Sequence, residues 1–247
     1  MISVCMATFN GEKYLKEQIK SILIQLEIND EIIISDDGST DCTIEIIKSF
    51  NDPRIKLYQN SFKNLISNFE FTLNNASGDY IFLSDQDDIW LPNKVELCMK
   101  SLISADLVMT NCKLVDSNLE IIHHSFFKLK KSKKGLINNL IKNSYLGCCM
   151  AFKKELLIKV LPFPKKIPMH DLWISFVAEC FFKTKFIEEP LVLYRRHGSN
   201  LSVTGEKSPF SLFQKICFRF NIIRYCFSSF GIVRSFSRKF SFNKLKK

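Results

Sequence analysis

Three aspartates within four residues, Asp85, Asp87 and Asp88, follow directly after an apolar run at residues 80–83. An apolar run of this length is typical of a buried strand, so these carboxylates are expected where that strand ends. Carboxylates this close repel one another, and a hard divalent cation with oxygen ligands relieves the repulsion. The pattern therefore indicates a metal site at the end of a strand.

A second acidic segment, residues 35–41 (SDDGSTD), follows the apolar run Ile32–Ile34 in the same way. In an open α/β sheet, ligands bind beyond the carboxyl ends of the strands. Two strands that both end in acids therefore predict one shared site at this edge. The ordinary alternative for Asp36 and Asp37 is an Asp-Gly turn that leads into a helix.

Apolar runs alternate with helical periodicity along the first half of the chain. The strands are almost continuously apolar, which is typical of a parallel sheet covered by helices on both faces. A doubly wound, nucleotide-binding half is therefore predicted. We expect strands at Ile2–Phe9, Glu31–Ser35, Ile55–Tyr58, Asp79–Leu83 and Leu107–Thr110, and helices at Glu12–Leu26, Thr40–Phe50, Leu65–Asn75, from Pro92 onward and at Asp171–Phe181.

The chain has 247 residues and a net charge of +10, with 46% hydrophobic and 24% charged residues, which suits one main globular domain. Almost all of the excess charge lies in residues 206–247, where ten Lys and Arg stand against one Glu. We therefore divide the chain into a body, residues 1–205, and a basic tail, residues 206–247. Because the charge is confined to the tail and no nucleic-acid motif is recognised, nucleic acid is not expected as a partner.

The nine cysteines show no Cys-x-x-Cys spacing, and one is left over in any pairing, which favours a reducing compartment over a disulfide framework. The N-terminus lacks the basic region and the small-residue cleavage site of a secretory signal. No uncharged stretch approaches the roughly 20 residues that cross a bilayer. We therefore expect a cytoplasmic protein.

Five segments have the residues and the order that are typical of the family 2 glycosyltransferases. The chain resembles this family over residues 1–205, and its Asp-Gln-Asp-Asp-Ile-Trp segment is most similar to that of bacterial rhamnosyltransferases and related enzymes of capsule, O-antigen or cell-wall polysaccharide assembly. The five segments are residues 3–11 (SVCMATFNG), 35–41 (SDDGSTD), 82–90 (FLSDQDDIW), 169–173 (MHDLW) and 194–200 (YRRHGSN).

This resemblance implies a GT-A fold, an α/β architecture in which a mixed, mostly parallel sheet is flanked by helices. It also implies an inverting, metal-dependent transfer of a hexose, with L-rhamnose as one candidate. The donor would be a UDP- or dTDP-linked sugar, and the acceptor a saccharide or a polyprenyl-linked saccharide.

The resemblance also implies that a Mn²⁺ or Mg²⁺ ion binds the acidic loop, with Asp87 on the metal and Asp85 in contact with both metal and nucleotide. His197 matches a histidine that contacts the metal or the diphosphate in some members, and a structural role is its alternative. A divalent ion would stabilise the charge that builds on the departing nucleoside diphosphate. The alternative for the acids is to cap the following helix.

The nucleoside is expected over the ends of the first strands. Backbone groups of Thr8, Phe9 and Asn10 would face the base. Asp36 or Asp37 would accept a hydrogen bond from the imide of uracil or thymine, and an acceptor at this place selects a pyrimidine that carries an N–H.

Inversion at the anomeric carbon needs a base that takes the proton of the acceptor hydroxyl on the face opposite the leaving group. Asp171 is the candidate for this base. The alternative role for Asp171 is that of an acid in the first turn of an amphipathic helix. The family commonly has another acid just before this Asp, which His170 replaces here, where its imidazole could hydrogen-bond an acceptor sugar. The residues expected to contact substrate are Asp88, for sugar hydroxyls or a metal-bound water, Arg195, for phosphate, and Gly147, His170 and Trp173.

Apolar side chains recur at helical spacing along the tail and are flanked by basic residues. A helix of this kind can lie in the headgroup region of an anionic bilayer, where each nearby cation contributes about 1 kcal/mol. The protein would then lie on the inner face of the cell membrane, beside a lipid-linked acceptor; the alternative is that the tail packs on the body. The apolar positions are Phe213, Ile216, Phe220, Ile223, Phe227 and Phe230.

Two other functions are compatible with parts of the sequence. A sugar-1-phosphate nucleotidylyltransferase needs a Gly-rich, basic phosphate loop near the N-terminus, where this chain offers only Gly11 and Lys13. A non-enzymatic protein that binds membranes or nucleic acid through its basic tail would leave the acidic loops without a role.

Overall fold

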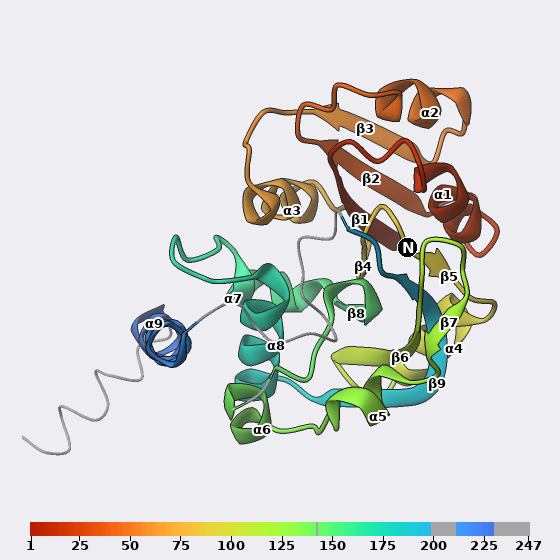
Figure 1. Cartoon of the computed structure of the whole chain (residues 1–247). Coiled ribbons are helices and arrows are strands. Elements are labelled where there is room, and N and C mark those ends of the chain that lie inside the picture. The colour runs from red at the N-terminus through yellow and green to blue at the C-terminus, as the bar shows by residue number, and fades with distance from the viewer. Residues whose placement is uncertain (142, 199–210, 230–247) are drawn as a thin grey trace, which may run out of the picture.

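One sheet of nine strands, flanked by helices, organises the computed structural model, which describes residues 1–141, 143–198 and 211–229 (Figure 1). The strand order is β3-β2-β1-β4-β8-β6-β9-β5, and β7 pairs with β6. The predicted boundary near residue 205 and most of the basic tail lie outside the described residues.

The N-terminal half is the predicted run of parallel strands and helices. Strands β1 and β2 are buried along their whole length, as expected for strands covered on both faces. Helix α1 is shorter than predicted because residues 11–14 form a turn, in which Tyr14 N donates to Gly11 O. The elements are β1 (Ile2–Thr8), α1 (Leu15–Leu23), β2 (Glu31–Asp36), α2 (Thr43–Ser49), β3 (Ile55–Gln59), α3 (Leu65–Asn74) and β4 (Tyr80–Ser84).

The second half extends the sheet with strands of both directions. Strand β8 pairs antiparallel with both β4 and β6, and β9 runs parallel to β6. Its elements are β5 (Ile89–Trp90), α4 (Lys94–Leu102), β6 (Leu107–Val115), β7 (Ile121–His123), α5 (Phe126–Lys130), α6 (Leu136–Ile141), the 3₁₀ turns η1 (Gly147–Cys149) and η2 (Lys154–Leu156), β8 (Met150–Lys153), α7 (Leu157–Val160), α8 (His170–Phe181), β9 (Thr184–Arg195) and α9 (Leu212–Ser229).

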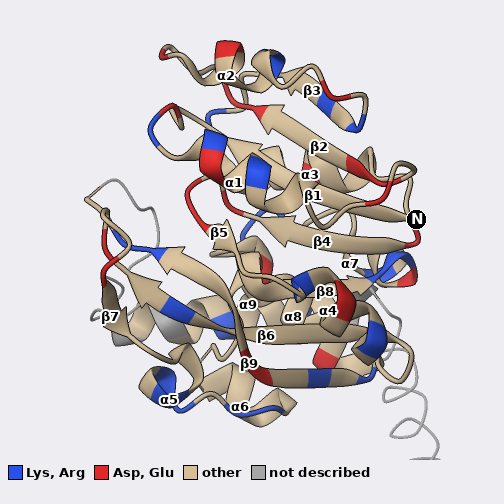
Figure 2. Ribbon diagram, turned by 90° about the vertical axis from the view of Figure 1, so that its right-hand side faces the viewer, with Lys and Arg blue, Asp and Glu red and all other residues tan. Residues whose placement is uncertain are grey.

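The register of the parallel strands brings the two acidic segments to one edge of the sheet. Thr8 at the end of β1 pairs with Asp36 on β2, and Met6 pairs with Ser84 at the end of β4. Figure 2 shows acidic segments, in red, beyond the arrowheads of β2 and β4. The predicted common edge is therefore confirmed.

The helices that flank the site come from both halves of the chain. Helix α3 packs on β1 and β2, while α4 packs on β6, β8 and β9. Helix α8 lies against α6, α7 and α9, and it brings the segment around residue 170 to the molecule's interior. Among the described residues, no helix is long and apolar enough to cross a membrane.

Gly78, just before β4, lies in close contact with the backbone at the start of β1. A Cβ at this position would lie 2.8 Å from backbone atoms of Met1, Ile2 and Ser3. We expect Gly78→Ala to lower the free energy of unfolding by about 1–3 kcal/mol, because backbone atoms must move to make room. Urea denaturation measures the change.

The matched control is Gly198→Ala, because a Cβ there would meet none of the described residues within 4 Å. Its effect is expected to stay within about 0.5 kcal/mol. Equal stability of the two variants would contradict the close packing of β4 on β1.

Candidate active site

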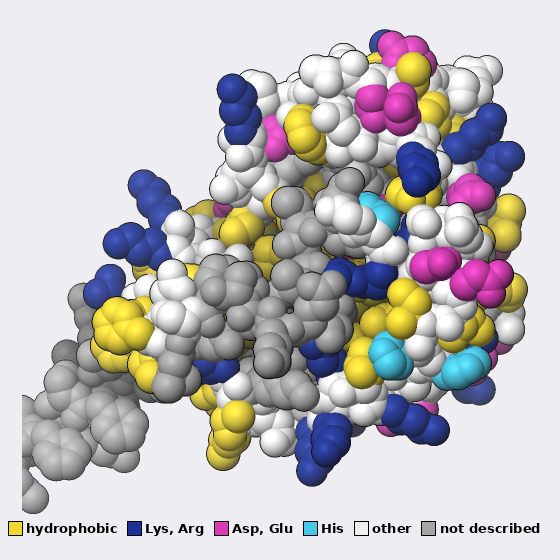
Figure 3. All heavy atoms as spheres, viewed as in Figure 1, with side chains coloured by type: hydrophobic (Ala, Val, Ile, Leu, Met, Phe, Trp, Pro, Cys, Tyr) yellow, Lys and Arg dark blue, Asp and Glu magenta, His cyan; other side chains and the backbone are white. Residues whose placement is uncertain are grey.

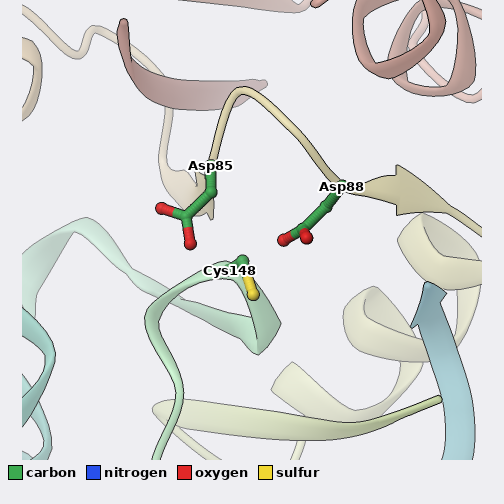
Figure 4. A group of neighbouring side chains, drawn as sticks. All are labelled: Asp85, Asp88 and Cys148. Atoms are coloured by element: carbon green, nitrogen blue, oxygen red, sulfur yellow. The ribbon is translucent and has the colours of Figure 1, made fainter. Parts of the chain in front are cut away.

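The acidic loop between β4 and β5 brings two carboxylates and a thiol together (Figure 4). One oxygen each of Asp85 and Asp88 and the Sγ of Cys148 all lie within 4.8 Å of one another. Burial, together with the charges of Asp87 and Asp171, raises the pKa of Asp85 to about 8. Burial also raises the pKa of the Cys148 thiol, so Cys148 is a neutral group beside the acids.

Asp88 is the most enclosed of these acids, with no exposed surface. Its Oδ1 accepts a hydrogen bond from the backbone N of Arg195 at 3.0 Å, and its Oδ2 has no hydrogen-bond partner among the described residues. Burial raises its pKa well above the usual value. Asp88 thus links the acidic loop to the end of β9 through one oxygen, and its contact with sugar hydroxyls or a metal-bound water stays a prediction.

Asp87 and His197 meet although they are far apart in sequence. His197 Nε2 lies 2.8 Å from Asp87 Oδ2, and both side chains are partly buried. The imidazole also packs on the ring of Tyr14, with 4.9 Å between ring centroids. The two residues predicted to bind metal from different motifs thus lie side by side.

Arg195 holds the acidic loop from behind and is itself only 2% exposed. Its guanidinium donates to Asp87 O at 2.9 Å, to Ser117 O at 3.1 Å and to Glu17 Oε2 at 2.8 Å. It also lies 4.3 Å from the centroid of the Tyr14 ring. The predicted phosphate contact of Arg195 is therefore wrong, since its donors are directed to the protein and not to a ligand.

Asp171 lies at the start of α8, beside the turn η1. Its Oδ1 accepts from the backbone N of Leu172 at 2.6 Å. Burial raises its pKa to about 6, although hydrogen bonds from Leu172, Gly147 and Asn143 oppose the shift. Because the charge of Asp171 also raises the pKa of Asp85, the two carboxyls are close enough to interact.

His170 and Gly147 adjoin Asp171, as predicted for the substrate region. A Cβ on Gly147 would lie 3.0 Å from His170 Nε2 and 3.6 Å from Asp171 Cβ. The prediction for Trp173 is wrong: its side chain is 1% exposed, and Nε1 donates to Val160 O at 2.9 Å. Trp173 therefore fixes α8 to α7 and does not reach a ligand.

Asp36 and Asp37, both predicted to accept a hydrogen bond from the imide of the base, have different surroundings in the structure. Asp36 is buried and accepts hydrogen bonds from Thr8 Oγ1, Gly38 N, and both the N and the Oγ of Ser39. Four bonds fill the roughly four acceptor sites of a carboxylate. The prediction that Asp36 accepts from a base is therefore corrected to an Asp-Gly turn.

Asp37 keeps acceptor capacity that Asp36 lacks. Its two oxygens accept one hydrogen bond each, from the backbone N of Lys63 and of Asn64, both at 2.8 Å. A carboxylate offers roughly four acceptor sites, so these bonds leave some of them for a ligand. Of the two aspartates, Asp37 is therefore the better candidate for contact with a base.

The backbone groups of residues 8–10, which were expected to face the base, make hydrogen bonds within the protein. Thr8 O accepts from Asp37 N, and Asn10 N donates to Ser39 Oγ at 2.8 Å. The side-chain amide of Gln86 accepts from Phe9 N at 2.9 Å and donates to Phe9 O at 3.0 Å. A base that uses these groups must displace them, and Phe9 and Asn10 are both exposed at the surface.

Sequence reasoning missed three residues that shape the site: Gln86, Tyr14 and Glu17. Gln86 ties the acidic loop to the end of β1. Tyr14 supports both Arg195 and His197, and Glu17 pairs with the Arg195 guanidinium. The position of Gln86 within the acidic motif of residues 85–88 could have indicated a role for it. Nothing in the sequence links residues 14 and 17 to residues 195 and 197.

The donor set of the acidic loop fits a hard divalent ion. The carboxylates of Asp85 and Asp87 and the imidazole of His197 are ligands that Mn²⁺ accepts, and carboxylates also suit Mg²⁺. Asp88 and Cys148 lie beside Asp85 in the same cluster. The acidic cluster predicted from the sequence is therefore present.

Residues 3–161 match the family Glycosyl transferase family 2. The chain therefore belongs to the family 2 glycosyltransferases and is an enzyme of this class, with a GT-A fold, as its motifs predict. It is 31% identical to the dTDP-rhamnosyl transferase RfbG of Shigella flexneri over 214 residues, covering 79% of this chain and 72% of that protein.

A second relative is the UDP-Glc:alpha-D-GlcNAc-diphosphoundecaprenol beta-1,3-glucosyltransferase WfgD of Escherichia coli, 30% identical over 184 residues, or 72% of this chain and 70% of that protein. Among solved structures, the fold is similar to S. aureus TarS 1-349 in complex with UDP-GlcNAc, with a TM-score of 0.70 at 18% identity. That match covers 92% of this chain and 66% of TarS, so the chain spans about two thirds of the TarS structure.

The fold is also similar to the mannosyltransferase PcManGT from Pyrobaculum calidifontis in complex with GDP-Man and Mn²⁺. The TM-score is 0.61 at 17% identity, covering 91% of this chain and 69% of that chain. At these identities the two structures support the fold alone.

Arg195 and Glu17 allow a test of how the acidic loop is held. We expect Arg195→Leu to lower the free energy of unfolding by about 2–4 kcal/mol, because it removes the Arg195 donors from the partly buried carbonyls of Asp87 and Ser117. Urea denaturation measures this loss.

Glu17→Gln is the matched control, because Glu17 is 57% exposed and a surface ion pair contributes at most about 1 kcal/mol. Equal losses in the two variants would contradict the view that Arg195 acts through its bonds to the loop backbone.

Proposed function

We propose that this chain is an inverting, metal-dependent glycosyltransferase that moves a hexose from a UDP- or dTDP-linked sugar to a saccharide or polyprenyl-linked saccharide. The observation that carries the proposal is the position of Asp171. This carboxyl, with a pKa raised to about 6 by burial, lies close enough to the acidic loop beyond β4 for its charge to act on Asp85. Displacement with inversion requires a base for the acceptor hydroxyl, and a divalent ion at the acidic loop would stabilise the leaving diphosphate.

In the proposed reaction the acceptor hydroxyl attacks the anomeric carbon, and its proton passes to a carboxylate oxygen of Asp171. The bond from the acceptor oxygen to that carbon forms as the bond to the diphosphate oxygen breaks. Asp85, which lies in the cluster with Asp88 and Cys148, would hold Mn²⁺ or Mg²⁺ together with the adjoining Asp87 and His197. The ion would neutralise the charge on the departing diphosphate. Arg195 contributes by fixing the backbone of Asp87.

The substrate classes follow from the relatives. WfgD is named for UDP-Glc and a diphosphoundecaprenol-linked acceptor, and RfbG for dTDP-rhamnosyl transfer. Both names support a pyrimidine nucleotide donor, and the spare acceptor capacity of Asp37 suits the imide N–H of such a base. We therefore place the enzyme in the synthesis of bacterial surface polysaccharide. Family membership favours this function over the nucleotidylyltransferase and over a non-enzymatic binding protein.

Helix α9 supports a second part of the proposal, contact with an anionic membrane surface. Ile222 and Cys226 are buried in the protein, so part of the helix packs on the body. Phe213, Ile216 and Phe220 are instead exposed, and Figure 3 shows hydrophobic side chains, in yellow, at the place of α9. An exposed apolar face next to basic residues suits the headgroup region where a polyprenyl-linked acceptor lies.

Asp171→Asn tests the proposed base. Transfer should fall by at least about a hundredfold, since proton removal alone is worth about 10²–10⁴ in rate and an amide cannot accept the proton. The free energy of unfolding at pH 8 should rise by about 1–3 kcal/mol, because the wild-type carboxylate loses its proton above a pKa of about 6 and is then a buried charge. Release of nucleoside diphosphate and urea denaturation measure the two effects.

Asp79→Asn, at the opposite end of β4 and largely exposed, is the matched control and should leave transfer unchanged. In the wild type, kcat/KM should decrease as the pH falls through about 6, because Asp171 then becomes protonated. Full activity of Asp171→Asn would remove Asp171 from the mechanism.

The membrane contact is tested by replacing Phe213 and Phe220 with Ser. The double variant should bind vesicles of phosphatidylglycerol and phosphatidylcholine at least about tenfold more weakly, since it loses two exposed aromatic rings. Co-sedimentation measures the binding. Ile28→Ser, an equally exposed apolar position in the N-terminal half, is the control and should bind as the wild type does.

A further inference from the structure

Helices α6 and α9 each carry an exposed apolar face. Five large apolar side chains on the two helices are between 55% and 75% exposed, and on each helix they follow one another at helical spacing. Figure 3 shows hydrophobic side chains, in yellow, at the places of α9 and of α6. Single exposed apolar residues are ordinary, whereas a group of them indicates a surface that meets a partner. The five residues are Ile137 and Ile141 of α6 and Phe213, Ile216 and Phe220 of α9.

Arg219 joins the two helices although they are far apart in the sequence. From α9, its guanidinium donates to the backbone carbonyls of Leu140 and Ile141 at the end of α6. Ile216 lies one turn before Arg219, so it stands on the same side of α9 as the side chain that reaches α6. The apolar faces of the two helices therefore adjoin, and we call them together the α6–α9 face.

The segments that form the α6–α9 face are basic. Residues 121–142 contain six Lys and neither Asp nor Glu, and residues 211–229 contain one Lys, two Arg and again no acid. Glu179, on α8 beside α6, is directed into the protein, because its Oε1 accepts from Gly135 N and from the hydroxyls of Tyr145 and Thr184. The division into a nearly neutral body and a basic tail thus overlooks a second basic segment within the body.

Charge complementarity identifies an anionic surface as the partner of this face. Apolar side chains that stand out from basic helices enter the headgroup region of a bilayer, while the Lys and Arg beside them meet the phosphates of anionic lipids. An acidic protein would satisfy the same charges. The choice between the two depends on where the face lies relative to the active site.

The α6–α9 face adjoins the proposed base. Helix α6 ends at Ile141, two residues before Asn143, and the Asn143 side chain hydrogen-bonds Asp171. Two residues of chain span at most about 7 Å. A sugar that a polyprenyl diphosphate carries in the headgroup region would therefore lie near Asp171, whereas an acidic protein would have no part in the reaction. The position of the face favours lipid.

We propose that the α6–α9 face lies on an anionic bilayer, with Ile137 and Ile141 in the headgroup region beside the aromatic residues of α9. The inference rests on the proposed function and deepens it, because it adds a segment of the body to the membrane contact proposed for α9. Two helices in contact with the bilayer would also fix the orientation of the enzyme, with the Asp171 side of α8 toward the membrane.

Ile137→Ser combined with Ile141→Ser tests this contact in the full chain. Co-sedimentation with vesicles of phosphatidylglycerol and phosphatidylcholine should show binding at least about tenfold weaker than that of the wild type, because two apolar side chains no longer enter the bilayer. The wild type should bind vesicles of phosphatidylcholine alone at least about tenfold more weakly than the mixed vesicles, since these lack the anionic lipid.

The matched control is Ile24→Ser combined with Ile28→Ser. These isoleucines have the same spacing as the test pair, lie in the N-terminal half and are 79% and 74% exposed. The control variant should bind the mixed vesicles as the wild type does. An equal loss in the two double variants would overturn the inference, because binding would then follow exposed apolar area and not its place in the fold.

A tryptophan reporter keeps the inference testable if the double variant fails to fold. The two native tryptophans, Trp90 and Trp173, are at most 2% exposed and give a constant background. The emission of Ile141→Trp should move to shorter wavelength when the mixed vesicles are added, because the ring enters a less polar region. Ile28→Trp should show no such shift.

Two results would overturn the inference alone. One is wild-type vesicle binding by the Ile137 and Ile141 double variant while the Phe213 and Phe220 double variant binds weakly, and the other is unchanged emission of vesicle-bound Ile141→Trp. A wild type that binds no anionic vesicles would overturn the membrane contact of α9 as well. Release of nucleoside diphosphate, measured without vesicles, tests the transferase activity separately, so a failure of that activity is distinguished from a failure of this surface.

Discussion

Mutual repulsion among buried carboxylates is the constraint on which the rest of the site depends. Burial raises the pKa of Asp85, Asp88 and Asp171, and neighbouring acids add to the shift at Asp85 and Asp88. Such a cluster costs folding free energy when it is ionised. A divalent ion would offset this cost at the acidic loop, and Asp171, on the other side, would remain a base of moderate strength.

The structure holds these acids in place through connections between distant parts of the chain. Gln86 joins the acidic loop to the end of β1, while Arg195 joins it to β9 and, through Glu17, to α1. His197 then reaches Asp87 because β9 ends beside this loop. The site is thus assembled from the parallel half and the later strands together, which explains why the late motifs accompany the early ones in a single chain.

Local sequence patterns were enough to predict the parallel strands of the N-terminal half and the sheet edge at which their acidic segments lie. The apolar runs before Asp36 and Asp85 fix two strand ends, and parallel register places them together. The later half was less readable, because β8 is four residues long and pairs antiparallel with two strands distant in sequence. Arg195 and Trp173 were misassigned for the same reason: motif position indicates proximity to the site, whereas the direction of a side chain depends on tertiary partners.

Direct measurement of Mn²⁺ binding tests the central claim, that the acidic loop is a divalent cation site. Electron paramagnetic resonance of free Mn²⁺ would report the affinity of the full chain with and without UDP or dTDP. The account predicts binding that strengthens when the nucleotide is present and that is lost in Asp87→Ala. Mn²⁺ binding by Asp87→Ala with unchanged affinity, or no binding by the wild type in the presence of either nucleotide, would contradict it.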